Sequence, residues 1–209
     1  MEIDHVLIAV VDLATAAREM EEHHGLASVE GGRHPGWGTA NRIVPLGDTY
    51  LELAAVVDEA EARHSVFGSW VGRGANISGQ PVGWAVRTDD IEDVSRRLGL
   101  TVRAGSRVTP TGDRLEWRAA GMEEAAAESS LPFFIEWGPR TPFPGHAVVK
   151  HRGGTPRITG ILTHGDADRL ADWLDGHELP VIVSPGNPTL TAIVLSRVGG
   201  AIVLGTQDP

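Results

Sequence analysis

Apolar and polar positions along the chain form short runs, and one order of runs recurs. The first pass predicts a strand, a helix, a strand and a two-stranded hairpin, at 3–10, 13–24, 27–30, 41–46 and 49–57. Asp12 is placed to cap the helix at its N-terminus, and Gly25 is placed to end it. Gly47 and Asp48 form a turn signal between the two strands of the hairpin.

The same order of runs restarts twice further along the chain. The second pass predicts a strand at 82–88, a helix from Asp90 to about Leu98, and strands at 100–103, 113–118 and 131–137. An insert rich in alanine and glutamate, Gly121 to Ser130, lengthens its last connection. The third pass predicts the elements 158–163, 167–175, 180–183, 190–197 and 201–205.

This repetition divides the chain into modules and connectors. We expect a first βαβββ module at 1–57, a connector at 58–80, a second βαβββ module at 81–138, a connector at 139–155 and a third, degenerate module at 156–209. Within the first connector, a helix is expected at 59–72 and a linker at 72–79. Self-similarity of this kind predicts an α+β fold of repeated βαβββ modules, because it constrains the whole chain rather than one segment.

Composition narrows the classes of function. The chain has 209 residues and a formal net charge of −10, and it contains no block of lysine or arginine, which argues against nucleic acid and anionic membranes as partners. It has no cysteine, so disulfides, thiolate metal sites and cysteine nucleophiles are excluded. No signal peptide or membrane-spanning run is recognisable, and we expect a soluble, cytoplasmic protein that binds a small molecule.

Two strands of the first module carry a charged or metal-ligating residue among apolar ones. Glu52 lies between Leu51 and Leu53, whose side chains point to the opposite face because side chains alternate along a strand. Glu52 therefore either faces water or is held inside a concave sheet. His5 interrupts the strand 3–10 in the same way, and the two together are a candidate site.

The modules align residue by residue. His5 falls over Gly83 and Glu52 falls over Glu136, whereas the third module has Gly160 and Val203 at these places. A carboxylate buried among apolar residues, as Glu136 is expected to be, costs several kcal/mol unless it is paired or bound to a metal. The alternative interpretation is that each residue is structural or faces solvent.

The segments DHVLIAVVDL, GGRHPGWGTANRIVPLGDTYLELAAV, GWAVRTDDI and LPFFIEWG, over roughly residues 1–146, resemble the glyoxalase-like domain family of the vicinal oxygen chelate (VOC) superfamily. The resemblance implies paired sheets that form a cup, with a divalent metal held by the first and last strands of each module. Mapped here, the metal ligands are His5, Glu52 and Glu136, because Gly83 has no side chain to offer. Such a set suits Mn, Fe, Mg or Zn, and it also suits a cup that binds an organic ligand without metal.

The glycine-rich stretch that begins at Gly31 has capacity for anion binding, hydrogen bonding and stacking. The candidate substrate-binding residues are Arg33, His34, Trp37, Asn41, Trp84 and Trp117. The alternative interpretation is that the stretch is only the structural entry to a hairpin. Trp84 and Trp117 would then belong to the core or to the wall of the cup. Since GxGxxG and the Walker lysine pattern are absent, no nucleotide cofactor is expected.

The resemblance favours a lyase or isomerase of the glyoxalase kind that acts on a small, oxygen-rich and acidic substrate. Glu52 or Glu136 would be the general base, Arg33 would hold a substrate carboxylate, and a metal, if bound, would act as a Lewis acid. One alternative is a non-catalytic protein that sequesters a ligand, and another is a dioxygenase-like oxidoreductase. The apolar strands of the third module are expected to pack on the first two modules or on a second subunit of a homodimer.

Overall fold

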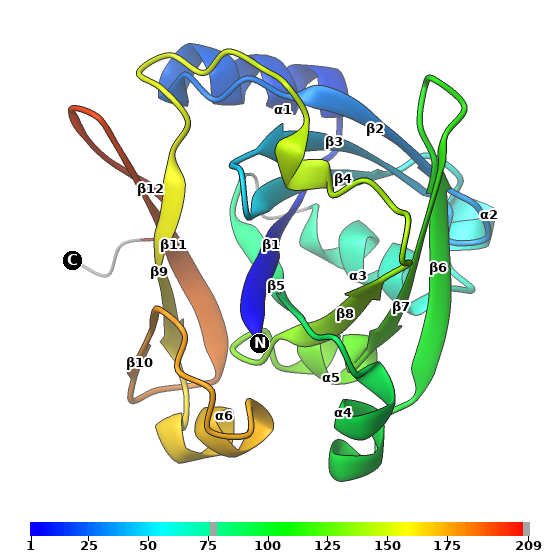
Figure 1. Cartoon of the computed structure of the whole chain (residues 1–209). Coiled ribbons are helices and arrows are strands. Elements are labelled where there is room, and N and C mark those ends of the chain that lie inside the picture. Colours follow the sequence, from blue (N-terminus) through cyan, green and yellow to red (C-terminus); the bar gives the residue numbers. More distant parts are fainter. Residues whose placement is uncertain (76–78, 207–209) are drawn as a thin grey trace.

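The computed structural model describes residues 1–75 and 79–206, which form two sheets flanked by helices (Figure 1). The first sheet is a closed barrel with the strand order β1-β4-β3-β2-β6-β7-β8-β5. Its strands are β1 (Glu2–Ala9), β2 (Val29–His34), β3 (Thr39–Pro45), β4 (Tyr50–Val56), β5 (Pro81–Arg87), β6 (Val102–Val108), β7 (Arg114–Ala120) and β8 (Phe133–Trp137). The barrel positions the candidate site.

The second sheet is four-stranded and has the order β10-β9-β11-β12. Its strands are β9 (Arg157–His164), β10 (Val181–Ser184), β11 (Thr189–Arg197) and β12 (Gly200–Gly205). The α-helices are α1 (Leu13–Glu19), α2 (Glu59–Ala62), α3 (Val66–Gly74), α4 (Ile91–Leu98), α5 (Met122–Ala127) and α6 (Ala167–Trp173). A π-helical segment, Met20–His24, continues α1, and a 3₁₀ turn is found at Pro144–His146.

The helix boundaries follow from local chemistry. The Asp12 carboxylate accepts a hydrogen bond from the Thr15 backbone N–H at 2.7 Å and caps α1, as the sequence predicts. The hydrogen bond lowers the pKa of that carboxyl. Gly25 ends the π-helical segment in the left-handed conformation, with φ of 70°. The predicted cap of α4 is confirmed in the same way, by a bond from the Asp93 N–H to Asp90.

The first two modules share one topology. β1 runs parallel to β4, and β5 runs parallel to β8, while β1 and β5 pair antiparallel and join the modules. On the other side, β2 meets β6 where Arg33 pairs with Val108. The α+β fold of paired βαβββ modules is therefore confirmed. The third unit repeats the succession of elements, but its first strand lies inside the sheet rather than at an edge, so its strand order differs.

Several boundaries differ from the sequence-based ones. β2 continues to His34, so residues 31–34 belong to a strand and not to a loop. The predicted helix 59–72 is two helices, α2 and α3, separated at 63–65. The predicted linker 72–79 begins inside α3, and its residues 76–78 lie outside the described part of the chain. The division into separate domains stays a prediction.

Two apolar clusters stabilise this arrangement. One fills part of the barrel interior and includes Leu7, Phe67, Trp70 and Phe133. The other lies outside the barrel wall and joins it to the second sheet, with Trp84 and Phe134 in contact with the cluster formed by Ile161, Ile193, Trp173 and Leu204. The second sheet therefore covers an apolar barrel face, with β11 against β5, and lies to one side of the barrel in Figure 1. Among the described residues, no helix is long and apolar enough to cross a bilayer.

Candidate active site

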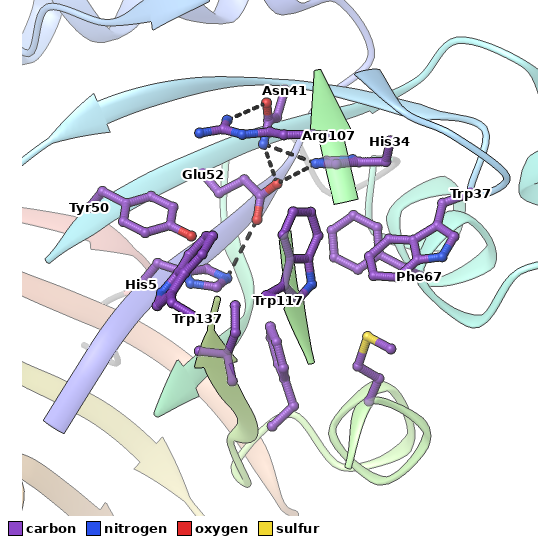
Figure 2. Close-up of a pocket in the computed structure, with 13 residues that line it drawn as sticks. His5, His34, Trp37, Asn41, Tyr50, Glu52, Phe67, Arg107, Trp117 and Trp137 are labelled. Atoms are coloured by element: carbon purple, nitrogen blue, oxygen red, sulfur yellow. Dashed lines mark hydrogen bonds and ion pairs between the residues drawn. The ribbon is translucent and has the colours of Figure 1, made fainter. Parts of the chain in front are cut away.

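A small cavity lies inside the barrel, and polar groups gather on one of its walls (Figure 2). Its volume is about 30 Å³, room for little more than a water molecule. The lining residues come from both modules and from helices α3 and α5: His5, His34, Trp37, Asn41, Tyr50, Glu52, Phe67, Arg107, Trp117, Met122, Phe133, Ile135 and Trp137. A larger ligand would have to displace some of these side chains.

A bulge in β1 brings two neighbouring polar residues inside the barrel. Ile3 pairs with Val86 and His5 pairs with Ala85, so Asp4 is an extra residue in this strand. Asp4 is fully buried, and its carboxylate lies 2.6 Å from His5 Nδ1 and accepts a bond from Trp137 Nε1 at 2.9 Å. The carboxylate thereby fixes the Nδ1–H tautomer of His5 and directs Nε2 toward the cavity.

Glu52 is buried at the centre of the polar wall (Figure 2). Its Oε1 accepts a hydrogen bond of 2.6 Å from Asn41 Nδ2, and its Oε2 lies 3.4 Å from His5 Nε2. His5 Nε2 has no hydrogen-bond partner within the described residues. A neutral His5 would therefore point an unsatisfied acceptor at a carboxylate oxygen, which is unfavourable in a buried place unless a proton or another cation lies between them.

Arg107 brings a fixed positive charge into the same wall. Its guanidinium is buried and donates to Asn41 Oδ1 at 3.0 Å, and this burial lowers its pKa. Gly31 makes this approach feasible, because a Cβ at that position would lie 2.0 Å from Asn41 Oδ1 and 2.3 Å from the guanidinium. Asn41 thus connects the Arg107 cation with the Glu52 carboxylate.

The remaining titratable groups of the wall are held neutral. Burial lowers the pKa of His34 to about 4, with Arg107 and His5 adding to the decrease and Glu52 opposing it. His34 Nδ1 bonds to Thr39 Oγ1 at 2.8 Å, while Nε2 faces the Asn41 amide at 3.2 Å. Burial raises the pKa of Tyr50 well above its usual value, and the neighbouring carboxylates of Asp4 and Glu52 add to that increase.

Aromatic side chains form the rest of the cavity. The His5 ring stacks on Tyr50 with 4.6 Å between centroids and meets the edge of Phe133. The indoles of Trp37, Trp117 and Trp137 form a continuous wall, with centroid separations of 5.7 and 5.6 Å. The same three indoles line a second groove of about 600 Å³ on the outer side.

The structure brings six of the predicted site residues together. These are His5, Glu52, His34, Trp37, Asn41 and Trp117, and all of them line the cavity. They come from the strands β1, β2, β3, β4 and β7 and from the turn that follows β2. The glycine-rich stretch thus contributes His34, Trp37 and Asn41 to the lining of the cavity.

Three other predicted residues do not join the cavity. Glu136 lies on the outer face of β8, where it accepts bonds from Arg118 at 2.5 Å and from the Ile91 backbone N–H of α4 at 3.3 Å. Its neighbours Ile135 and Trp137 face inward instead. Arg118 lies opposite Glu136 on the neighbouring strand β7, and it satisfies the Glu136 carboxylate on this outer face.

Arg33 and Trp84 also lie outside the cavity, because each side chain points away from the barrel interior. Arg33 is exposed, because His34 next to it on β2 points inward and successive side chains alternate. Trp84 is fully buried in the cluster between the barrel and the second sheet, and its indole N–H donates to the Ser130 carbonyl at 3.3 Å. Arg107 occupies the cationic position that was expected of Arg33.

The sequence analysis did not select several lining residues, namely Tyr50, Phe67, Arg107, Met122, Phe133, Ile135 and Trp137, nor Asp4, which bonds to His5 behind the lining. For Arg107 a signal existed, since it aligns with Arg33 in the second module and lies two positions after Gly105, on the same face of β6. For Asp4 the sequence carried none, because only the bulge turns it inward.

The strand register identifies the true counterparts of His5 and Glu52. The pairs between β1 and β5 are symmetric when His5 corresponds to Gly83 and Leu7 to Ala85, because His5 pairs with Ala85 and Leu7 pairs with Gly83. Leu7 pairs with Glu52 and Ala85 pairs with Phe133, so Phe133, rather than Glu136, is the counterpart of Glu52. The second module offers no ligand atom at either place.

A divalent metal of the VOC type does not fit this donor set. Catalytic metal sites commonly use three protein ligands, whereas His5 and Glu52 are the pair that remains of the expected set. Within residues 1–75 and 79–206, no group of three or more histidine, cysteine, aspartate or glutamate residues is arranged to hold a metal. Gly83 is covered by Trp70, whose ring would be 2.2 Å from a Cβ there.

Comparisons with known proteins identify the family of the chain. The model of the glyoxalase-like domain family matches residues 3–177. A hypothetical protein from Staphylococcus aureus has a similar structure, with a TM-score of 0.65, 17% identity, and coverage of 97% of this chain and 84% of that chain. No functionally curated protein matches the chain.

Methylmalonyl-CoA epimerases also match part of the chain. The enzyme from Mycobacterium tuberculosis has 22% identity and a TM-score of 0.44, with 66% of this chain and 87% of that chain covered. A Streptomyces coelicolor epimerase has 18% identity and a TM-score of 0.47, with 69% and 99% covered. The paired modules and the polar cavity between them define a protein of the VOC superfamily. Within it, the chain belongs to the glyoxalase-like domain family.

Proposed function

We propose that the protein is a glyoxalase-like isomerase or lyase that moves a proton on a small, acidic, oxygen-rich metabolite. One observation carries the proposal: Glu52, a buried carboxylate, lies between an imidazole and an amide that is bound to a buried guanidinium. A base beside a cation, in a place shielded from water, suits proton abstraction next to a carbonyl or carboxylate.

The residues have distinct roles in this proposal. Arg107 holds the anionic oxygens of the ligand through charge-assisted hydrogen bonds. Glu52 removes a proton from the carbon next to the carbonyl, and the electrons of that C–H bond move onto the carbonyl oxygen to give an enolate or enediolate. Arg107 and the Asn41 amide stabilise the negative oxygen, and the proton returns to carbon from Glu52.

Hydrogen exchange in D₂O tests this function. The full-length protein is mixed with small 2-hydroxy and 2-oxo acids, and the loss of the proton signal next to the carbonyl is followed by ¹H NMR. General base catalysis predicts exchange about 10²-fold or more above the protein-free rate for at least one acid. Glu52→Gln is expected to abolish exchange while the acid still binds.

A non-catalytic binding protein is the second candidate, favoured by the tryptophan wall around the cavity. Saturable binding of an acid without exchange in any member of the panel would support it. Neither binding nor exchange across the panel would contradict both candidates. A dioxygenase-like reaction is not proposed, because the donor set lacks the ligands that a redox metal requires.

A further inference from the structure

The cavity and the groove of about 600 Å³ beside it share a wall of three indoles, those of Trp37, Trp117 and Trp137. We propose that this groove is the second half of the binding site, and that it takes an uncharged, planar substituent, such as an aromatic ring, of the acid whose carboxylate binds at Arg107. The inference rests on the proposed function for the acidic end of the ligand and adds the chemical class of the other end.

The first step of the argument is space. The cavity measures about 30 Å³, so an acid that carries a substituent larger than a methyl group cannot lie wholly inside it. The groove measures about 600 Å³, within the range of roughly 300–1,000 Å³ that is common for ligand pockets. Three other large grooves share no described lining residue with the cavity. The substituent therefore has its nearest space beside the three indoles.

The second step is the chemistry of the groove. Gly105 lies opposite Trp117 on the neighbouring strand, and a Cβ there would lie 2.4 Å from Trp117 Nε1, so the glycine leaves room for the indole. Trp137 Nε1 donates to Asp4, whereas within the described chain the indole N–H groups of Trp37 and Trp117 have no acceptor. Indoles favour flat π systems, and their N–H groups donate to an oxygen of a ligand or of water. A planar substituent therefore suits this wall better than a saturated one.

The third step is the charge at the rim of the groove. Arg114 pairs with Glu116 at 2.9 Å, and Arg118 pairs with Glu136 at 2.5 Å. Each of these cations already has a carboxylate, with which a phosphate or a second carboxylate of the ligand would have to compete. The buried Arg107, by contrast, donates to a neutral amide. The charged end of the ligand therefore belongs in the cavity and the uncharged end in the groove.

The fourth step is access. Trp37 lies in the turn between β2 and β3, where Gly36 and Gly38 on either side have positive φ of 76° and 69°. Its indole is held by contacts with three aromatic neighbours, at centroid separations of 5.9, 5.3 and 5.7 Å. Since this indole makes no hydrogen bond within the described residues, its rotation exchanges ring contacts for contacts with the ligand and breaks no hydrogen bond. We therefore expect the wall to open at Trp37.

The test compares three 2-hydroxy acids that share the acidic end. Lactate carries a methyl group, mandelate a phenyl ring, and hexahydromandelate the saturated ring of the same size. Isothermal titration calorimetry of the full-length protein is expected to give an affinity for mandelate about threefold or more above that for hexahydromandelate, because contact with indoles adds to the area that either ring buries. Burial of apolar area alone would favour the saturated ring, since it is the more hydrophobic of the two.

Three variants locate the ring of the ligand. Trp37→Leu and Trp117→Leu each replace an indole by an apolar side chain without a π face, and each is expected to reduce the ratio of the mandelate affinity to the hexahydromandelate affinity below about 1.5. Val11→Ala is the matched control, because Val11 is 79% exposed and lines two of the other grooves, and it should leave the ratio unchanged. A general loss of affinity for the acidic end cancels in the ratio.

The outcomes separate the hypotheses. A wild-type ratio below about threefold overturns the inference, and so does a ratio that folded Trp37→Leu and Trp117→Leu both retain or that Val11→Ala removes. If neither tryptophan variant folds, the wild-type ratio decides. Exchange of the lactate proton without a preference for mandelate overturns this inference alone, whereas the preference without proton exchange in any acid contradicts the proposed function alone. No binding of any of the three acids contradicts both.

Discussion

At the scale of single residues, the site depends on which neighbours of a strand face inward. His34 and Arg33 are adjacent on β2, and the inward position of His34 places Arg33 in solvent. The buried cation of the cavity comes from Arg107 on β6 instead. Arg33 on β2 and Arg107 on β6 therefore differ completely in environment, which makes them a useful pair for mutation.

Arg107→Gln is expected to weaken the binding of a small carboxylate by about 1.5–3 kcal/mol, the contribution of a hydrogen bond to a charged group. Arg33→Gln removes the same charge from the exposed outer face and should change binding by less than about 0.5 kcal/mol. Isothermal titration calorimetry with a 2-oxo acid measures both. Equal losses for the two variants would show that only net charge matters and would exclude Arg107 from the site.

His34 predicts a specific dependence of stability on pH. Its pKa in the folded protein is about 4, compared with 6.5 for an exposed histidine, so the unfolded state binds its proton first as the pH falls. The stability that neutral His34 contributes is complete above pH 6.5 and is lost between pH 6.5 and about 4, by roughly 3 kcal/mol. Urea unfolding of the wild type and of His34→Gln at several pH values measures the difference. Parallel curves for the two proteins would contradict the assignment.

At the scale of secondary-structure elements, packing between α3 and β5 closes the side of the cavity that lacks ligands. Trp70 of α3 covers Gly83 of β5, and the indole occupies the space that a side chain at this position would need. Close approach of a helix to a strand through a glycine explains why the second module cannot carry a ligand there. It also gives the glycine a structural role that can be measured.

Gly83→Ala should destabilise the protein by about 1–3 kcal/mol, because the new Cβ would lie 2.2 Å from the Trp70 ring. Gly72→Ala is the matched control within α3, where the nearest heavy atom to the new Cβ is 3.6 Å away. This second substitution should stabilise the helix by about 0.5–1 kcal/mol. Thermal and chemical unfolding measure the change in the free energy of unfolding for both variants. An unchanged stability of Gly83→Ala would refute the packing of Trp70 on β5.

At the scale of the whole molecule, the second sheet has no residue in the cavity, and it buries its apolar face against the barrel. Ile161, Ile193 and Trp173 contact the same cluster as Trp84 and Phe134. The expectation that the third unit is scaffolding therefore agrees with the packing, with the first two modules rather than another subunit covering these side chains. Their burial is a large apolar contribution to the stability of the full chain.

Ile193→Ala should lower the free energy of unfolding by about 2–5 kcal/mol, because it opens a cavity at a fully buried position between the sheet and the barrel. Ile182→Ala provides the control in the same sheet, since that side chain is 61% exposed, and it should cost less than about 0.5 kcal/mol. Urea unfolding with a single transition for both variants would also show that the sheet and barrel unfold together. Similar losses from the two substitutions would contradict the packing.

The sequence by itself determined the paired βαβββ modules, most of the strands and helices, and the proximity of His5 to Glu52. These features depend on local patterns: alternation in strands, the Asp12 and Asp90 caps, and a repeat that fixes topology. The family resemblance also follows from contiguous segments, since residues 3–177 match one family model. These patterns can be recognised in the sequence alone because they do not depend on residues that are distant along the chain.

Only the tertiary structure decided which residues face the cavity. Glu136 and Ile135 are adjacent on β8, and both orientations are compatible with an apolar strand until Arg118 and α4 provide a partner for the carboxylate. The bulge that turns Asp4 inward depends on the register of β1 against β5, which are far apart in sequence. Since a shift of one residue reverses every side chain of a strand, the ligand set could be established only from the register between modules.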